Sequence, residues 1–242
     1  MWPRVRGVLK RTVERLPTSL EDLIRDGYHR HLVRTGRFLS EEPDLHLLLA
    51  VLRPGDWVID IGANIGHYTI PLAQATGPSG RVIAVEPLPA SFRRLVANVA
   101  SAQLQNVTLI NIAASSSSSI QGIEVPTFTD GKRNPYCAHL AMGDASAAVD
   151  RVLCLPLDML KFPQPIRAIK VDAEGHEGEI LDGMQELILK DLPLLVLEES
   201  PSHRHAILAE AGYRELKLRG SPNRIFATDE KIQSLRSFRM SR

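Results

Sequence analysis

The chain has 242 residues, enough for one substantial hydrophobic core but few for two, so a single α/β unit is the first expectation. Its 29 basic and 28 acidic residues nearly balance, which argues against nucleic-acid binding as the main function. The two cysteines, Cys137 and Cys154, are too few for a disulfide framework and lack metal-type spacing, so we expect reduced thiols in a cytoplasmic protein. No apolar run approaches the ~20 residues that span a bilayer.

Residues 1–43 are expected to form an N-terminal helical extension. Their beginning lacks the apolar centre of a signal peptide and is amphipathic and basic, with Trp2, Val5, Val8 and Leu9 among Arg4, Arg6, Lys10, Arg11 and Arg15. This segment could contact an anionic membrane surface peripherally. The alternative is a helix packed on its own domain or on a partner subunit, as in a homodimer. A helical pattern continues from about Ser19 to Leu52 and ends at the turn sequence RPGD.

From residue 57 onward, short apolar runs rich in Val and Ile alternate with helical patterns. The runs are typical of strands buried on both faces of a parallel sheet: Trp57–Ile61, Val82–Val85, Val107–Ile112, Ala168–Val171 and Leu194–Leu197. The helical patterns between them include residues 88–104 and 177–190. This alternation therefore predicts that residues 44–242 form one domain with a Rossmann-like, doubly wound, mostly parallel sheet. Its last two strand-like runs, 213–219 and 223–228, predict a C-terminal antiparallel hairpin.

Residues 120–157 interrupt this alternation. An insertion at this point lies beside the carboxyl edge of the sheet, so it is a candidate wall of the substrate site. The serine run that precedes it, Ser115–Ser119, is expected to be a solvent-facing loop.

The segment VIDIGANIGHYT follows the first predicted strand with a tight turn at Gly62 and Gly66, which indicates close approach of the backbone to a ligand. A dinucleotide site would show G-x-G-x-x-G, whereas this spacing is G-x-x-x-G and Asp60 precedes it. A carboxylate there repels phosphate and attracts cations. S-adenosylmethionine, with its ammonium and sulfonium groups, suits such a turn.

Glu86 ends the second predicted strand, at a position where an acidic residue can bind ribose hydroxyls. Asn64 and Tyr68 could add polar contacts to the methionine end or the ribose, although a tyrosine early in a helix is as often merely packed.

A second acidic segment, IKVDAEGHEGEIL, follows the fourth predicted strand and points into the same crevice, where a methyl acceptor would bind. Asp172, Glu174 and His176 are the candidate catalytic bases. Glu177 and Glu179 are better explained as acids that stabilise a helix N-terminus. Glu198 and Glu199 could complete a divalent-metal site with Asp172, but the sequence gives no ligand geometry and we predict no metal.

With these motifs the chain resembles the FkbM-type S-adenosylmethionine-dependent methyltransferases, from about Asp44 to Leu218. Besides the glycine turn, the resemblance rests on RVIAVEPLPASFRRLVANV, VTLINIAAS, the pair Leu157–Asp158 and, most distinctively, K-x-D-x-E-G-x-E beginning at Lys170.

The resemblance implies a seven-stranded Rossmann-like fold and methylation of a hydroxyl oxygen on a sugar, glycolipid or polyketide-like natural product, free or lipid-linked. It also implies the cofactor contacts, with the methionine side held at Asp60, Gly62, Ala63, Asn64 and Gly66 and the ribose at Glu86. One departure concerns adenine: the family commonly continues Gly-Asp after the third strand, whereas here Ser115 follows, so the backbone near Ala113 is the expected contact.

Two other functions remain open from the sequence. One is a NAD(P)-dependent oxidoreductase, which the missing third glycine disfavours. The other is a catalytically silent cofactor-binding scaffold that acts through partners.

Overall fold

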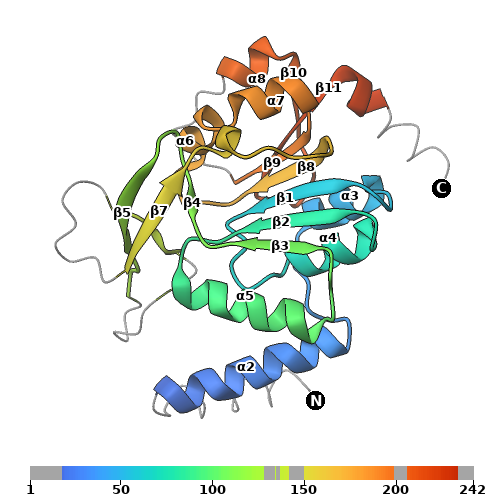
Figure 1. Cartoon of the computed structure of the whole chain (residues 1–242). Coiled ribbons are helices and arrows are strands. Elements are labelled where there is room, and N and C mark those ends of the chain that lie inside the picture. The colour runs from blue at the N-terminus through green and yellow to red at the C-terminus, as the bar shows by residue number, and fades with distance from the viewer. Residues whose placement is uncertain (1–17, 128–133, 135–136, 142–149, 199–205, 234–242) are drawn as a thin grey trace.

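The computed structural model describes residues 18–127, 134, 137–141, 150–198 and 206–233. Its centre is a seven-stranded sheet in the order β10-β11-β9-β8-β1-β2-β3 (Figure 1). The strands are β1 (Trp57–Ile61), β2 (Arg81–Val85), β3 (Val107–Ile110), β8 (Ile166–Val171), β9 (Leu194–Leu197), β10 (Tyr213–Leu216) and β11 (Arg224–Thr228). All neighbours are parallel except β11, which is antiparallel to β9 and β10. The predicted sheet and C-terminal hairpin are confirmed.

Helices cover both faces of this sheet. One face carries α3 (Pro43–Val51), α4 (Thr69–Thr76) and α5 (Pro89–Ser101), and the other carries α6 (Glu177–Asp182), α7 (Gln185–Asp191) and α8 (Ala206–Glu210). Val58 packs into the first layer and its neighbour Ile59 into the second, because successive strand residues point to opposite faces. This double coverage explains why the strands are almost continuously apolar.

The strand order reverses next to β1, since the chain runs outward through β2 and β3 and then returns to place β8 on the other side. In an open sheet of this kind, ligands bind outside the carboxyl ends of the strands at such a reversal. The expected ligand site is therefore at the carboxyl ends of β1, β2 and β8.

The predicted helix over residues 19–52 consists of two helices, α2 (Thr18–Arg34) and α3, with a turn between them at Gly36, whose φ is +67°. The α2 helix lies on α5, where Arg94 binds Asp22 at 2.5 Å and Asp26 at 3.0 Å. Of the helices that the structure describes, none combines the length and apolar character needed to cross a bilayer.

The prediction of one helix over residues 177–190 was also wrong, because α6 ends at Asp182 and α7 begins at Gln185. Gly183 lies in the break, and a Cβ atom there would be 1.9 Å from the carbonyl oxygen of Ser115. The chain is thus interrupted where it passes directly against the backbone of another segment.

The interrupting region forms a second sheet of order β4-β7-β5-β6, followed by the short helix η2 (Leu157–Met159) (Figure 1). Its strands are β4 (Ala113–Ala114), β5 (Ser119–Glu124), β6 (His139–Leu140) and β7 (Asp150–Leu155). The serine run is only partly the exposed loop that we expected: residues 116–118 are exposed, but Ser115 is buried.

Candidate functional site

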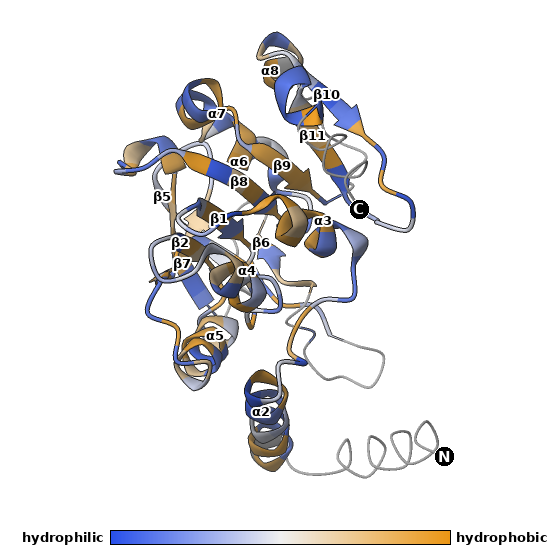
Figure 2. Cartoon of the chain, turned by 90° about the vertical axis from the view of Figure 1, so that its right-hand side faces the viewer, coloured by the Kyte–Doolittle hydropathy of each residue, from blue (hydrophilic) through white to orange (hydrophobic). Residues whose placement is uncertain are grey.

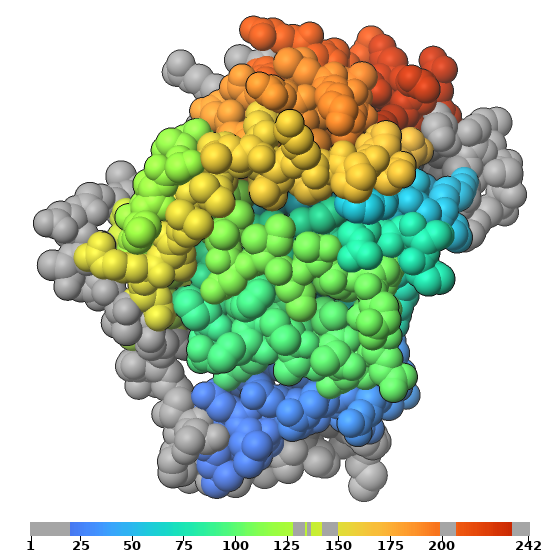
Figure 3. Space-filling model, viewed as in Figure 1, coloured from blue at the N-terminus to red at the C-terminus, as the bar shows by residue number. Residues whose placement is uncertain are grey.

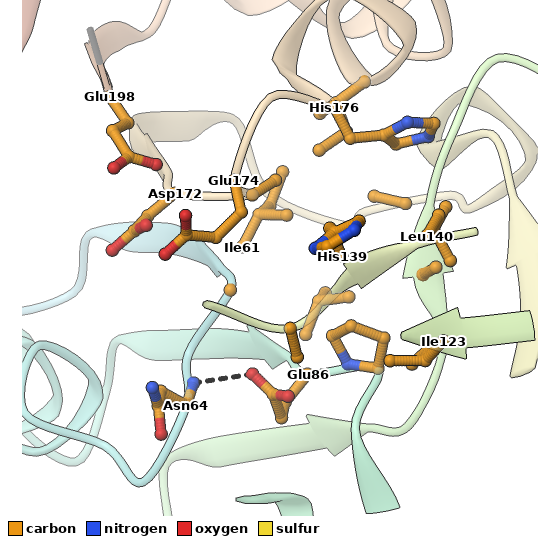
Figure 4. A pocket seen from close by; sticks show the side chains of 18 residues that line it. Ile61, Asn64, Glu86, Ile123, His139, Leu140, Asp172, Glu174, His176 and Glu198 are labelled. Atoms are coloured by element: carbon orange, nitrogen blue, oxygen red, sulfur yellow. Dashed lines mark hydrogen bonds between the residues drawn. The ribbon is translucent and has the colours of Figure 1, made fainter. Parts of the chain in front are cut away.

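A cavity of about 290 Å³ lies at the carboxyl ends of β1, β2 and β8 and is closed on one side by the second sheet (Figure 4). This volume is at the lower end of the range for small-molecule sites. Seven of the predicted site residues line it: Gly62, Asn64, Glu86, Ala113, Asp172, Glu174 and His176. The other four, Asp60, Ala63, Gly66 and Tyr68, lie outside the lining.

The turn after β1 is held by its own backbone. The N–H groups of Gly62 and Ala63 both donate to the carbonyl oxygen of Val85, at 2.9 and 3.0 Å. Asn64 has a φ of +48°, an unusual conformation for a residue with a side chain, and its N–H donates to Glu86 Oε2 at 2.7 Å. The turn and the end of β2 therefore form one rigid unit.

Both glycines of this turn are needed for packing within the protein. A Cβ atom on Gly62 would lie 1.8 Å from the carbonyl oxygen of Asp172, and one on Gly66 would lie 2.9 Å from Leu95 Cδ1. Both have positive φ angles, +72° and +102°. The sequence interpretation assigned both glycines to ligand approach. In the structure Gly62, which lines the cavity, also lets the ends of β1 and β8 meet, and Gly66 packs the turn against α5.

Glu86 lies at the edge of the cavity with only 6% of its surface exposed. Burial raises its pKa to about 7, although the backbone N–H groups of Leu88 and Asn64 favour the ionised form. Each carboxylate oxygen accepts one of these bonds and keeps further lone pairs. Glu86 can thus still accept hydrogen bonds from hydroxyl groups in the cavity.

Asp60 is fully buried on the α4 side of the sheet, behind the cavity. Its Oδ2 accepts a 2.6 Å bond from the Thr69 hydroxyl, while Oδ1 has no hydrogen-bond partner among the described residues. Burial raises the pKa of Asp60, and the positive charge of Lys170 opposes this. The strand alternation that brings Val58 to this face brings Asp60 as well.

Tyr68 is also directed away from the cavity. Its hydroxyl donates to Asp44 at 2.5 Å and contacts Glu42, and Asp44 in turn accepts a 2.6 Å bond from Ser221. The ring lies 4.7 Å beneath Lys170 Nζ. Tyr68 therefore belongs to a buried polar network behind the turn and lies outside the cavity lining.

Lys170 connects the two acidic segments that the sequence singled out. It is 3% exposed, and its ammonium binds Asp172 Oδ2 at 2.7 Å. Burial alone would lower the pKa of Lys170, but the nearby carboxylates of Asp172 and Asp60 raise it. Burial would likewise raise the pKa of Asp172, but Lys170 holds it below its usual value. Asp172 is thus an ionised carboxylate at the cavity wall.

Glu198, at the end of β9, is the protonated member of a carboxyl pair with Asp172. Burial and the negative charge of Asp172 raise its pKa to about 8, so near neutrality it donates a hydrogen bond to Asp172. Glu174 has a φ of +50°, and burial with the charges of Asp172 and Glu177 raises its pKa. Ligand atoms of Asp172, Glu174 and Glu198 all lie within 4.8 Å of one another, a spacing that a divalent cation could use. Glu199 lies outside the described residues.

The histidines of the cavity lie opposite this acidic cluster (Figure 4). His176 Nε2 is 3.0 Å from the Ser115 hydroxyl, and burial lowers its pKa. Its neighbour Glu177 accepts bonds from the backbone of Ala173 and Gly175, which is the structural role expected for it. Sequence reasoning missed His139 on β6, because only the pairing of β6 with β5 brings it here.

The second sheet supplies the apolar wall of the cavity through Ile123, Ala138 and Leu140. These residues belong to the insertion that the sequence offered as a candidate substrate wall. Near the end of β2, Val85, Pro87 and Ala113 form another apolar surface beside Glu86. At one end the cavity therefore has an apolar surface and the Glu86 carboxylate, which can accept hydrogen bonds from hydroxyl groups. At the other end it has a carboxylate cluster. This combination suits a cationic nucleoside.

Behind the turn, His67 stacks on Phe38 with ring centroids 4.3 Å apart, and Phe38 meets His29 of α2. Burial lowers the pKa of His67 from about 6.5 to about 4. The unfolded chain therefore binds more protons in this window, so stability falls as the pH falls from about 6.5 to about 4.

His67→Phe keeps the aromatic packing and removes this titration. We expect the variant to lose about 3 kcal/mol less stability than the wild type over the same acid range, as measured by urea unfolding. His46→Phe, at an exposed position of α3, is the matched control and should leave the pH dependence unchanged. If the wild type and His67→Phe lost equal stability in acid, the lowered pKa of His67 would not be the cause of the loss.

Residues 60–215 match the protein family described as the Methyltransferase FkbM domain. Hexuronic acid methyltransferase AglP of Haloferax volcanii is 30% identical over 146 residues, which cover 60% of this chain and 56% of that protein. The crystal structure of a methyltransferase FkbM from Methylobacillus flagellatus KT aligns with a TM-score of 0.52 at 17% identity, over 85% of this chain and 60% of that one. The chain spans less than two thirds of the length of either protein, and the structural likeness concerns the fold.

Proposed function

The chain belongs to the FkbM methyltransferase family, and from this premise we propose that it methylates a hydroxyl oxygen with S-adenosylmethionine as the donor. The acceptor class that we propose is a sugar, a glycolipid or a polyketide-like natural product. The observation that carries the proposal is the juxtaposition of Glu86 and Asp172 at opposite sides of one cavity. In this proposal Glu86 would bind the nucleoside and Asp172 would face the acceptor.

The residues of the cavity fit this donor. Glu86 would accept bonds from the ribose hydroxyls, and the apolar surface of Val85, Pro87 and Ala113 would cover the base. The carboxylates around Asp172 complement a positively charged group. Asp60 lies behind the cavity, where its Oδ2 accepts a bond from Thr69 and its Oδ1 has no hydrogen-bond partner among the described residues.

When bound, S-adenosylmethionine supplies an electrophilic methyl group. The chain has to position the acceptor hydroxyl in line and remove its proton. Asp172 is the best-placed base, because Lys170 keeps it ionised and its side chain is 43% exposed at the cavity wall. Glu174 and His176 remain the other candidates. Ile123 and Leu140 line the same cavity, where their apolar side chains would limit access of water to the reacting oxygen.

A sugar acceptor is supported by AglP, which is named for methylation of a hexuronic acid. Incubation with a labelled methyl donor and a panel of neutral sugars, hexuronates and glycolipids tests this proposal. Titration calorimetry with S-adenosylmethionine and NAD separates it from an oxidoreductase. Binding of S-adenosylmethionine without methylation of any acceptor would support the silent scaffold instead.

We expect Asp172→Asn to lower kcat by about 10² to 10⁴, because the amide cannot accept the proton. S-adenosylmethionine should still bind with an affinity changed far less than the rate, because Glu86 keeps its place for the ribose and Asp172 is only one carboxylate of the cluster. Single-turnover kinetics with a cognate acceptor, together with calorimetry, measures both. Asp182→Asn, an exposed aspartate at the end of α6, is the control. A rate equal to that of the wild type would exclude Asp172 as the base.

Glu86→Ala should weaken S-adenosylmethionine binding by about tenfold or more, since it removes an acceptor of charge-assisted hydrogen bonds. Because Glu86 also accepts two backbone bonds, Glu86→Gln is the gentler variant. In the wild type the affinity should rise as the pH rises through about 7, where Glu86 ionises, and in Glu86→Gln this dependence should vanish. An unaltered affinity in both variants, as expected for the control Glu186→Ala, would refute the ribose assignment.

A further inference from the structure

The α2 helix presents large apolar side chains to solvent. Leu20, Leu23, Ile24 and Tyr28 are 43%, 61%, 41% and 48% exposed. Their spacing of three and four residues brings them to neighbouring positions on one side of the helix. These four residues are called the α2 apolar face below.

The contacts of α2 with the domain fix this face outward. Asp22 and Asp26 bind Arg94 of α5, and Val33 is buried in the cluster that contains α5. The helix lies beyond α5, at the end of the molecule opposite α8 and β10 (Figures 1 and 3). Figure 2 shows it standing apart from the sheet, with hydrophobic turns among polar ones. Rotation to bury the apolar face would break both ion pairs.

Basic residues adjoin the face in the chain. His31, Arg34 and Arg37 follow it and are exposed. Residues 1–17, which precede it, contain five basic residues and one acidic residue, whereas the rest of the chain has more acidic than basic residues. An apolar helix face bordered by cations is complementary to anionic lipid headgroups over acyl chains.

We propose that the α2 apolar face docks peripherally on an anionic lipid surface, with the adjoining basic residues contacting the headgroups. A symmetric contact between two copies fits less well, because it brings the same basic residues to both sides of one interface. The docking does not depend on the proposed methyl transfer, and it can be measured without donor or acceptor.

The test is flotation of the full chain with vesicles of phosphatidylcholine, with or without phosphatidylglycerol, at low ionic strength. We expect binding only to the anionic vesicles and weaker binding as salt is added. Leu23→Asp/Ile24→Asp should lower the bound fraction about tenfold or more. The matched control is Leu189→Asp, since Leu189 is 56% exposed on α7, and it should bind like the wild type.

Absence of wild-type binding to anionic vesicles, or equal binding by the double variant, overturns the proposal. So does a dimer, seen by light scattering, that the double variant abolishes, because the face would then belong to a second copy. A Tm of the double variant that falls far more than the Tm of Leu189→Asp would show that the chain already covers this face, and it also overturns the proposal. None of these outcomes bears on methyl transfer, which is measured without vesicles, so the two proposals fail separately.

Discussion

Gly62→Ala is expected to destabilise the protein by more than about 4 kcal/mol, or to prevent folding altogether. The new Cβ atom would lie 1.8 Å from the carbonyl oxygen of Asp172, so β1 and β8 would have to separate at their carboxyl ends. The φ of +72° adds strain for any residue with a side chain. Urea unfolding measures the loss, and circular dichroism shows whether a folded state remains.

Gly36→Ala is the matched control for this substitution. Gly36 has a similar φ of +67°, but its Cβ position is open, with no atom within 4 Å. It should therefore lose only about 1 to 2 kcal/mol, from backbone strain alone. Equal losses in the two variants would mean that the contact between the turn and Asp172 is not essential.

Lys170→Met is the second substitution with a large expected effect, a loss of about 3 kcal/mol near neutral pH. Removing one partner of a buried ion pair leaves the other charge uncompensated. We expect a loss at the lower end of the range for broken buried ion pairs, because the Asp172 side chain is 43% exposed. Methylation should fall as well, since Asp172 loses the cation that keeps it ionised.

The pH dependence of this loss distinguishes charge from packing. Without Lys170, the pKa values of Asp60 and Asp172 rise, so the folded variant binds more protons than the unfolded chain and is penalised more as the pH rises. Urea unfolding in mildly acidic and mildly alkaline buffer should therefore show the smaller loss in acid. Lys190→Met, at an exposed lysine, is the control and should change little. A pH-independent loss for Lys170→Met would assign Lys170 a packing role only.

Most of the central sheet could be predicted from the sequence. The runs at Trp57–Ile61 and Leu194–Leu197 coincide with β1 and β9, because short, almost continuous apolar runs between turn sequences are typical of strands buried on both faces. Helix continuity was less predictable. The interruption between α6 and α7 lies at Gly183, where the chain passes against the backbone of Ser115, and no local pattern encodes this contact between segments.

The candidate site was predicted in its chemistry more than in its geometry. The acids at the ends of three strands were visible, and the structure brings Glu86, Asp172 and Glu198 to one cavity. Asp60 was expected there too, but it lies outside the cavity lining and its side chain bonds Thr69 of α4. Alternation along a strand relates Asp60 to Val58, but it does not say which face the cavity occupies. His139 arrives through the antiparallel pairing of β5 and β6, which joins residues outside any short motif.

The sequence by itself determined the succession of the central strands, the glycine turn and the acids that follow the strands, because these depend on local periodicity and local backbone freedom. The tertiary structure alone decided which acids share a cavity and which of them are ionised. Lys170 holds Asp172 charged, while burial keeps Glu198 protonated near neutrality. A pKa depends on burial and on distances to charges elsewhere in the chain, and neither exists until the chain has folded.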